Sequence, residues 1–128
     1  MAEDAPGDAA TALAIARDGR VAIGGTRGVR VVVAGALPEA LLRRGPVMDL
    51  VFFDAGALLV ATAEGLYRVE EGGRAVREHL APGSAVQVRR LAAARGTAVA
   101  AADSGVYVRE GGARWRMVRG LPRRPATL

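Results

Sequence analysis

Short apolar runs alternate with glycine-containing turns along most of the chain. The stretch ATAEGLYRVEEGG, residues 61–73, has two such runs, each closed by glycine. The runs are four to six residues long, and a turn glycine recurs about every nine residues. Segments this short do not make stable helices by themselves, whereas glycine supplies the positive φ of tight hairpin turns. The pattern therefore predicts β-strands joined by hairpins, even in the Ala-rich segment 89–95.

The turn glycines show that one unit occurs three times. Three glycine columns align without a gap: Gly19, Gly56 and Gly96; Gly28, Gly65 and Gly105; and Gly35, Gly72 and Gly112. The aligned units are 13–35, 50–72 and 90–112, spaced 37 and then 40 residues apart, so Arg90 is paired with Leu13 and Leu50. Small residues dominate the second run of each unit, which indicates sheets that pack face to face at close range.

Three hairpins per unit predict a four-stranded antiparallel meander. The fourth strand is RAVREHL in unit two and RWRMVRG in unit three. In unit one the segment ALPEALLRR contains Pro38, which an outermost strand tolerates, although a helical turn is the alternative. The predicted organisation is an acidic tail at 1–10 and a single domain at 11–128, with units at about 11–47, 48–87 and 88–122 and a basic C-terminal tail.

Units of this length and pattern resemble the blades of a β-propeller. The specific resemblance is to bacterial-neuraminidase-type (Asp-box) repeats, and it rests on VYVREGGARW at 106–115 followed by GLP at 120–122. The Asp-box pattern is Ser, any residue, Asp, any residue, Gly, any residue, Thr, Trp. Gly112 and Trp115 match it, Glu110 replaces the aspartate, and Val108 and Arg114 depart from it.

The resemblance implies a structural role for these residues. In that family the box is a corner on the rim of a blade, away from the catalytic face, so Glu110 and Trp115 are expected to hold a turn and pack under it. The sialidase activity of some relatives needs an arginine cluster, a tyrosine nucleophile and acids gathered from a whole ring. No such set can be matched in this sequence.

Three blades do not close a ring, because propellers typically contain about four to eight. Two open apolar faces would remain, to be buried by a second copy or by the remainder of a longer propeller. Two copies joined head to tail would give six blades, so a homo-oligomer, with a dimer favoured, is expected. The alternative fold is a β-trefoil, in which three four-stranded units close within one chain.

Composition removes several chemistries from consideration. The 128 residues contain no Cys, and all 18 basic residues are Arg, which excludes thiolate catalysis, Cys-ligated zinc, Schiff bases and a Walker lysine. The single histidine, His79, and the serines Ser84 and Ser104 form no recognisable triad. Asp18, Asp54 and Asp103 stand at turns, where carboxylates bond to backbone amides. No catalytic residue, metal site or cofactor is predicted.

The chain is also expected to lack a membrane-inserted segment, and nucleic acid is not an expected partner. The acidic first ten residues do not resemble a signal peptide, which leaves a cytoplasmic location, or a periplasmic or secreted one if a signal peptide has been removed.

Charge is distributed unevenly along the chain. Residues 1–83 hold nine Arg and eleven acids, net −2, whereas residues 84–128 hold nine Arg and two acids, net +7. Candidate partner-binding residues crowd this basic end: Arg114, Trp115, Arg116, Arg119, Arg123 and Arg124. They could receive an acidic protein, with Trp115 stacking on it, or pair with the acidic part of a second copy; a solvated face is the simpler interpretation.

These observations predict a non-catalytic binding or scaffolding module. A fragment of a larger propeller enzyme, such as a glycoside hydrolase or lyase, is one alternative. A carbohydrate-binding lectin is the other, although aromatic residues make up only 4% of the chain.

Overall fold

The computed structural model describes residues 9–33, 39–53, 57–70, 73–80, 86–110 and 114–118. Within these ranges the secondary structure consists of strands, turns and irregular segments, and no helix occurs. Accordingly, no helix long and apolar enough to cross a membrane is found in these ranges. The all-β prediction is confirmed for this part of the chain.

The described residues contain twelve strands, which form three antiparallel sheets of four strands each. The first sheet contains β1 (Ala10–Ile15), β2 (Val21–Gly25), β3 (Val29–Val32) and β4 (Glu39–Leu42). The second contains β5 (Val47–Phe53), β6 (Ala57–Thr62), β7 (Gly65–Val69) and β8 (Ala75–Glu78). The third contains β9 (Val88–Ala94), β10 (Thr97–Ala102), β11 (Gly105–Glu110) and β12 (Trp115–Met117).

Each sheet is a meander whose strand order follows the sequence, as predicted. Unit one does end in a strand, β4, and its predicted alternative, a helical turn, is not found at 39–42. The described strands form three separate open sheets and no closed barrel, which does not match the self-closing trefoil alternative.

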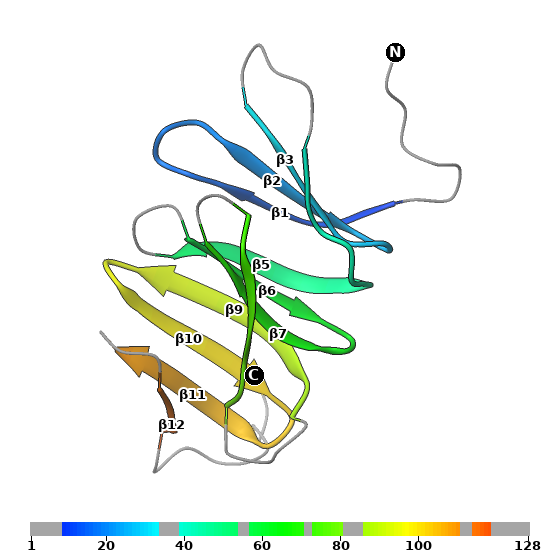
Figure 1. The fold of residues 1–128 in the computed structure, drawn as a ribbon. Coiled ribbons are helices and arrows are strands. Elements are labelled where there is room, and N and C mark those ends of the chain that lie inside the picture. Colours follow the sequence, from blue (N-terminus) through cyan, green and yellow to red (C-terminus); the bar gives the residue numbers. More distant parts are fainter. Residues whose placement is uncertain are drawn as a thin grey trace, which may run out of the picture.

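The three sheets follow one another with the second in the middle (Figure 1). Their first strands lie next to each other, β1 against β5 and β5 against β9. One core joins the first and second sheets and includes Val29, Leu42, Leu50 and Val60. A second core joins the second and third sheets and includes Leu59, Leu66, Leu91 and Trp115.

Small residues on the second strands allow the sheets to approach closely, as their sequence positions predict. A Cβ built at Gly24 of β2 would lie 2.6 Å from Cγ1 of Val47 and 2.9 Å from Cδ2 of Leu50. The neighbouring sheet therefore rests directly on the backbone of β2. The equivalent positions in the other sheets are Ala61 and Ala101, which lie in the same column of the repeat.

The structure corrects the predicted alignment of unit three. Opposite-strand pairing joins Leu13 to Ile23, Leu50 to Val60 and Leu91 to Ala100, so Leu91 is the counterpart of the two leucines. The ungapped alignment, which placed Arg90 there, is wrong by one residue. The reason is that the connection between the first and second strands is one residue shorter in unit three than in unit one.

The β9–β10 turn contains only two residues, Arg95 and Gly96, with φ of 52° and 80°. Two positive φ values in succession are typical of the tight type I′ hairpin turn. Between the equivalent pairs Ile15–Val21 and Ala93–Ala98, unit one has five connecting residues and unit three has four, which is the shift of one residue. Once this difference is included, the pairing of each first strand skips one residue at the same place, at Thr11, Met48 and Arg89.

The predicted turn glycines in the described ranges have positive φ: Gly19, Gly28, Gly65, Gly96 and Gly105. Gly56, Gly72 and Gly112 lie outside the described residues, as does the predicted turn residue Asp54. Asp18 has the predicted turn role, because its Oδ1 accepts a hydrogen bond from the backbone N–H of Arg20 at 3.1 Å.

The hydrogen bonds of the Asp18 turn make the stability of the fold depend on pH. The backbone N–H of Arg20, and next its guanidinium, hold the pKa of the exposed Asp18 carboxyl below its usual value. A carboxyl whose pKa is lower in the folded state stabilises that state above the unfolded pKa of about 4, and the contribution is lost as pH falls through the folded pKa.

We expect Arg20→Gln to leave most of the lowering of the Asp18 pKa in place, since the amide of residue 20 remains. A carboxyl ¹³C NMR titration of both proteins measures this. Return of the pKa to its usual value in the variant would contradict the backbone as the principal cause.

Candidate functional site

The predicted basic site is only partly described. Arg114 and Arg116 are exposed on either side of Trp115, whereas Arg119, Arg123 and Arg124 lie outside the described residues. Trp115 itself is buried in the core between the second and third sheets. Its indole therefore packs in the interior, and it is not exposed beside the arginines for stacking.

Trp115 belongs to a buried polar cluster around Glu78, which we call the Glu78 network. The indole Nε1 donates to Oε1 of Glu78 at 2.7 Å. Arg109 donates from Nε to Oε1 and from Nη2 to Oε2, each at 3.1 Å. Arg68 donates from Nε to Oε2 at 2.9 Å and also pairs with Glu70. Arg109 and Glu78 present a two-bond fork to each other, the strongest common geometry for such a pair.

The network connects two sheets. Glu78 ends β8 and Arg68 lies on β7, whereas Arg109 and Trp115 come from β11 and β12. The side chains of Glu78 and Arg109 are only 5% and 8% exposed. The guanidinium of Arg109 also lies over the ring of Phe53, 4.8 Å from its centroid. No buried polar side-chain atom in the described ranges lacks a hydrogen-bond partner, so these charges are fully compensated.

Glu78 and Arg109 were not among the residues predicted from the sequence, although the repeat contained a signal for Arg109. Arg109 stands in the column occupied by Val32 and Val69, on the side of each sheet that faces the preceding sheet of the repeat, where an apolar side chain is expected. A charge in an apolar column must be paired if it is buried. The position of the paired carboxylate, 31 residues away, could not be inferred from that column.

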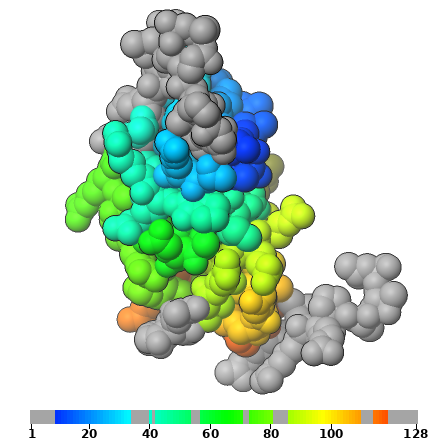
Figure 2. Space-filling model, turned by 90° about the vertical axis from the view of Figure 1, so that its right-hand side faces the viewer, coloured from blue at the N-terminus to red at the C-terminus, as the bar shows by residue number. Residues whose placement is uncertain are grey.

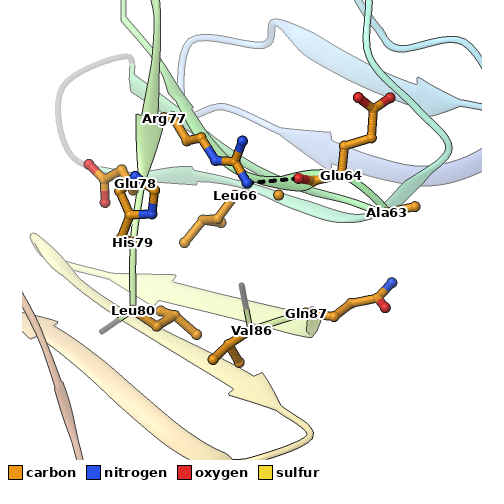
Figure 3. Close-up of a pocket in the computed structure, with 10 residues that line it drawn as sticks. Ala63, Glu64, Leu66, Arg77, Glu78, His79, Leu80, Val86 and Gln87 are labelled. Carbon is orange, nitrogen blue, oxygen red and sulfur yellow. Dashed lines mark hydrogen bonds between the residues drawn. The ribbon is translucent and has the colours of Figure 1, made fainter. Parts of the chain in front are cut away.

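The rim of the second sheet carries a pocket of about 130 Å³ (Figure 3). Leu66, Leu80 and Val86 form its apolar part, and the polar groups of Arg77, His79 and Gln87 surround it. Nη2 of Arg77 donates to the backbone oxygen of Glu64 at 3.0 Å. None of the ten lining residues is Ser, Thr, Cys, Tyr or Lys. His79 is exposed here, as its predicted outer position implied, and has no nucleophile beside it in the lining.

A second pocket, of about 250 Å³, lies at the outer edge of the first sheet. Arg27, Arg30 and Arg43 contribute to its lining together with Gly28, Val29 and two residues of β4. Elsewhere in the described ranges, the hydroxyl of Ser104 is hydrogen-bonded to that of Tyr107 at 2.7 Å. No group of three His, Cys, Asp or Glu residues able to hold a metal ion occurs among the described residues.

The most unusual surface is the side of the first sheet that faces away from the second. We call it the open face; its described residues are Leu13, Ile15, Val21, Ile23, Arg30 and Val32. Leu13 is 65% exposed and Ile15 is 73% exposed. Their counterparts in the second sheet, Leu50 and Phe52, belong to or pack against the core with the first sheet.

Polar contacts at the first strands accompany this packing between sheets. The hydroxyl of Thr11 on β1 donates to the carbonyl of Val47 on β5 at 2.7 Å. The backbone N–H of Leu91 on β9 donates to Oδ2 of Asp49 on β5, also at 2.7 Å. Each junction is thus held by apolar faces together with a side-chain bond to the neighbouring strand.

Comparisons with known proteins identify no relative: no protein-family model matches this chain, and no curated protein matches it either. The likeness to Asp-box blades therefore rests on the repeat and on residues 106–122 of this sequence. The function of the chain has to be inferred from the geometry of its surfaces.

Proposed function

We propose that this chain is a non-catalytic binding or scaffolding module made of three β-propeller blades, which completes its ring by associating with a second copy of itself. The observation that carries the proposal is the exposure of Leu13 and Ile15 on the open face. Two chains would supply six blades, a number within the range of closed propellers.

The repeat itself supports the completion of the ring. Leu13, Leu50 and Leu91 occupy one structural position, yet they are 65%, 1% and 8% exposed, respectively. The second and third sheets bury this position against the preceding sheet, whereas the first sheet has no preceding sheet among the described residues. Burial of a large aliphatic side chain stabilises by about 1.5–3 kcal/mol, so the open face favours association.

The arrangement of the sheets supports the blade interpretation. Each is a meander in sequence order, and the first strands lie side by side while the later strands extend away from them (Figure 1). Small residues on β2, β6 and β10 permit face-to-face contact. This is the arrangement expected of consecutive blades around an axis.

The assignment as a binding module rests on the chemistry of the described groups. The pocket beside His79 contains no nucleophile, and the Ser104 hydroxyl is engaged by Tyr107. The charged groups of the Glu78 network are hydrogen-bonded to one another, and those of Glu78 and Arg109 are buried. Packed sheets with exposed turns, such as those at 17–19, 63–64 and 103–104, suit recognition of a partner better than bond-breaking chemistry.

Measurement of mass in solution tests self-association. We expect light scattering on a size-exclusion column to give twice the chain mass of 13.2 kDa for the unaltered protein. Leu13→Asp should reduce it to the mass of one chain, because a buried unpaired carboxylate opposes the contact. Met48→Asp is the control, since Met48 is also exposed on a first strand but lies on the middle sheet, away from the open face. A monomeric unaltered protein would overturn the proposal.

A further inference from the structure

The third sheet has an outer face on which none of the other described strands packs. Its described residues are small or β-branched for the most part: Ala92, Ala94, Val99, Ala101, Val106 and Val108. None of them belongs to the core that joins the second and third sheets. The first and third sheets lie at opposite ends of the molecule, so the chain cannot cover one end with the other (Figure 2).

The outer face of the third sheet is the structural counterpart of the surfaces that already receive a neighbouring sheet. Gly24, Ala61 and Ala101 occupy one column of the repeat. Leu50 packs on Gly24, close enough that an added Cβ would lie 2.9 Å from its Cδ2. Leu91 shares a core with Ala61. Ala101 has no leucine of a following sheet packed on it in the described residues. Leu13 in turn has no preceding sheet whose small residue could receive it.

We infer that the open face of one copy docks on the outer face of the third sheet of another copy, with Leu13 placed on Ala101. The inference rests on the proposed self-association and specifies its surfaces: it is head to tail, and two copies bring together two identical junctions. We identify the partner as a second copy because each chain carries both surfaces of the contact, the open face and the outer face of the third sheet. Equivalent surfaces already meet at the two junctions within the chain.

Pairing of two open faces with each other would not reproduce these internal contacts. At both internal junctions a large side chain lies on a small residue, Leu50 on Gly24 and Leu91 near Ala61. Two open faces would oppose Leu13 and Ile15 to large aliphatic groups, with no small residues to receive them. Dense packing between sheets requires large side chains to fit against small ones, so pairing of two open faces would pack less densely than the internal junctions do.

The charged residues of the two faces do not prevent the contact. Arg90 replaces Asp49 on the first strand of the outer face, and Arg30 replaces Tyr67 on the third strand of the open face. Arg116 also lies on the outer face, opposite Val108 on the edge strand β12, where it is exposed. In the internal junctions first strands lie next to first strands, so Arg90 and Arg30 would lie over different strands of the partner. Each can lay its aliphatic stem on the interface with the guanidinium directed to solvent.

Complementation between two variants tests the inference. Leu13→Asp places a charge on the open face, and Ala101→Asp places one on the outer face of the third sheet, so each substitution prevents docking through the face that it alters. We expect each variant alone to have the mass of one chain and an equimolar mixture to regain twice that mass, because the heterodimer keeps one intact junction. Circular dichroism identifies a variant that does not fold; Ala101→Leu, which fills the site of Leu13 without a charge, then replaces Ala101→Asp and should also be monomeric.

The outcomes separate this inference from the proposed function. If Ala101→Asp and Ala101→Leu stay dimeric while Leu13→Asp is monomeric, the copies pair through their open faces and the inference is overturned, whereas self-association stands. The inference is also overturned if both variants are folded and monomeric but their mixture forms no dimer. The mixture is measured at concentrations at which the unaltered protein is dimeric. If the unaltered protein is monomeric, both the inference and the proposed self-association are overturned.

Discussion

Glu78→Gln is expected to lower the free energy of unfolding by about 3 kcal/mol. Breaking a buried ion pair by removing one partner typically costs about 3–5 kcal/mol, because the other charge stays buried without compensation. Here two guanidinium groups, those of Arg109 and Arg68, would lose the carboxylate that each contacts at 3.1 and 2.9 Å. Glutamine keeps the shape and one acceptor oxygen, which places the expected loss at the lower end.

Urea unfolding measures this effect at equal chain concentration. The fluorescence of Trp115, the single tryptophan, reports on the network, and far-ultraviolet circular dichroism reports on the sheets. Glu64→Gln is the matched control, because the Glu64 and Arg44 side chains are both more than half exposed and lie 3.6 Å apart. An exposed pair of this kind contributes at most about 1 kcal/mol. Equal midpoints for the two variants would show that the Glu78 charge does not hold the second and third sheets together.

Gly28→Ala is expected to destabilise the chain by about 3 kcal/mol or more. Gly28 has a φ of +143°, and a Cβ built there would lie 1.9 Å from the backbone oxygen of Leu42. The variant thus combines a backbone conformation that alanine rarely adopts with a collision against β4, which has to move. Loss of the pairing of Val29 with Leu42 would follow, and both residues belong to the core with the second sheet.

Gly19→Ala separates the two contributions. Gly19 also has a positive φ, +94°, but a Cβ built there meets nothing within 4 Å. Only the conformational strain remains, and we expect a loss of about 1–2 kcal/mol. Thermal unfolding of both variants measures the difference. If Gly19→Ala were as damaging as Gly28→Ala, the close approach of β4 would not be what restricts residue 28 to glycine.

Much of the architecture could be predicted because it depends on neighbours in sequence. Apolar runs too short for helices, with glycines such as Gly65 and Gly105 between them, specify hairpins through local backbone geometry. The three four-stranded sheets follow from these hairpins in sequence order. The turn role of Asp18 is similarly local, since its partner is two residues away.

The alignment of unit three shows where this reasoning fails. The glycine columns fit without a gap, and the two-residue turn at Arg95 and Gly96 shifts only the strand before it. A shift of one residue reverses the side of the sheet on which every side chain lies. Pairing between strands, which depends on the whole sheet, places Leu91 inward and Arg90 outward.

The sequence by itself determined the repeat, the strand class and the absence of cysteine and lysine chemistry. Only the tertiary structure decided that Glu78 meets Arg109 and Trp115, 31 and 37 residues further along the chain, because burial and pairing of charges depend on how separate sheets pack. It also decided that Leu13 is exposed while Leu50 and Leu91 are buried. The same residue in the same repeat position is core or surface according to whether another sheet lies against it.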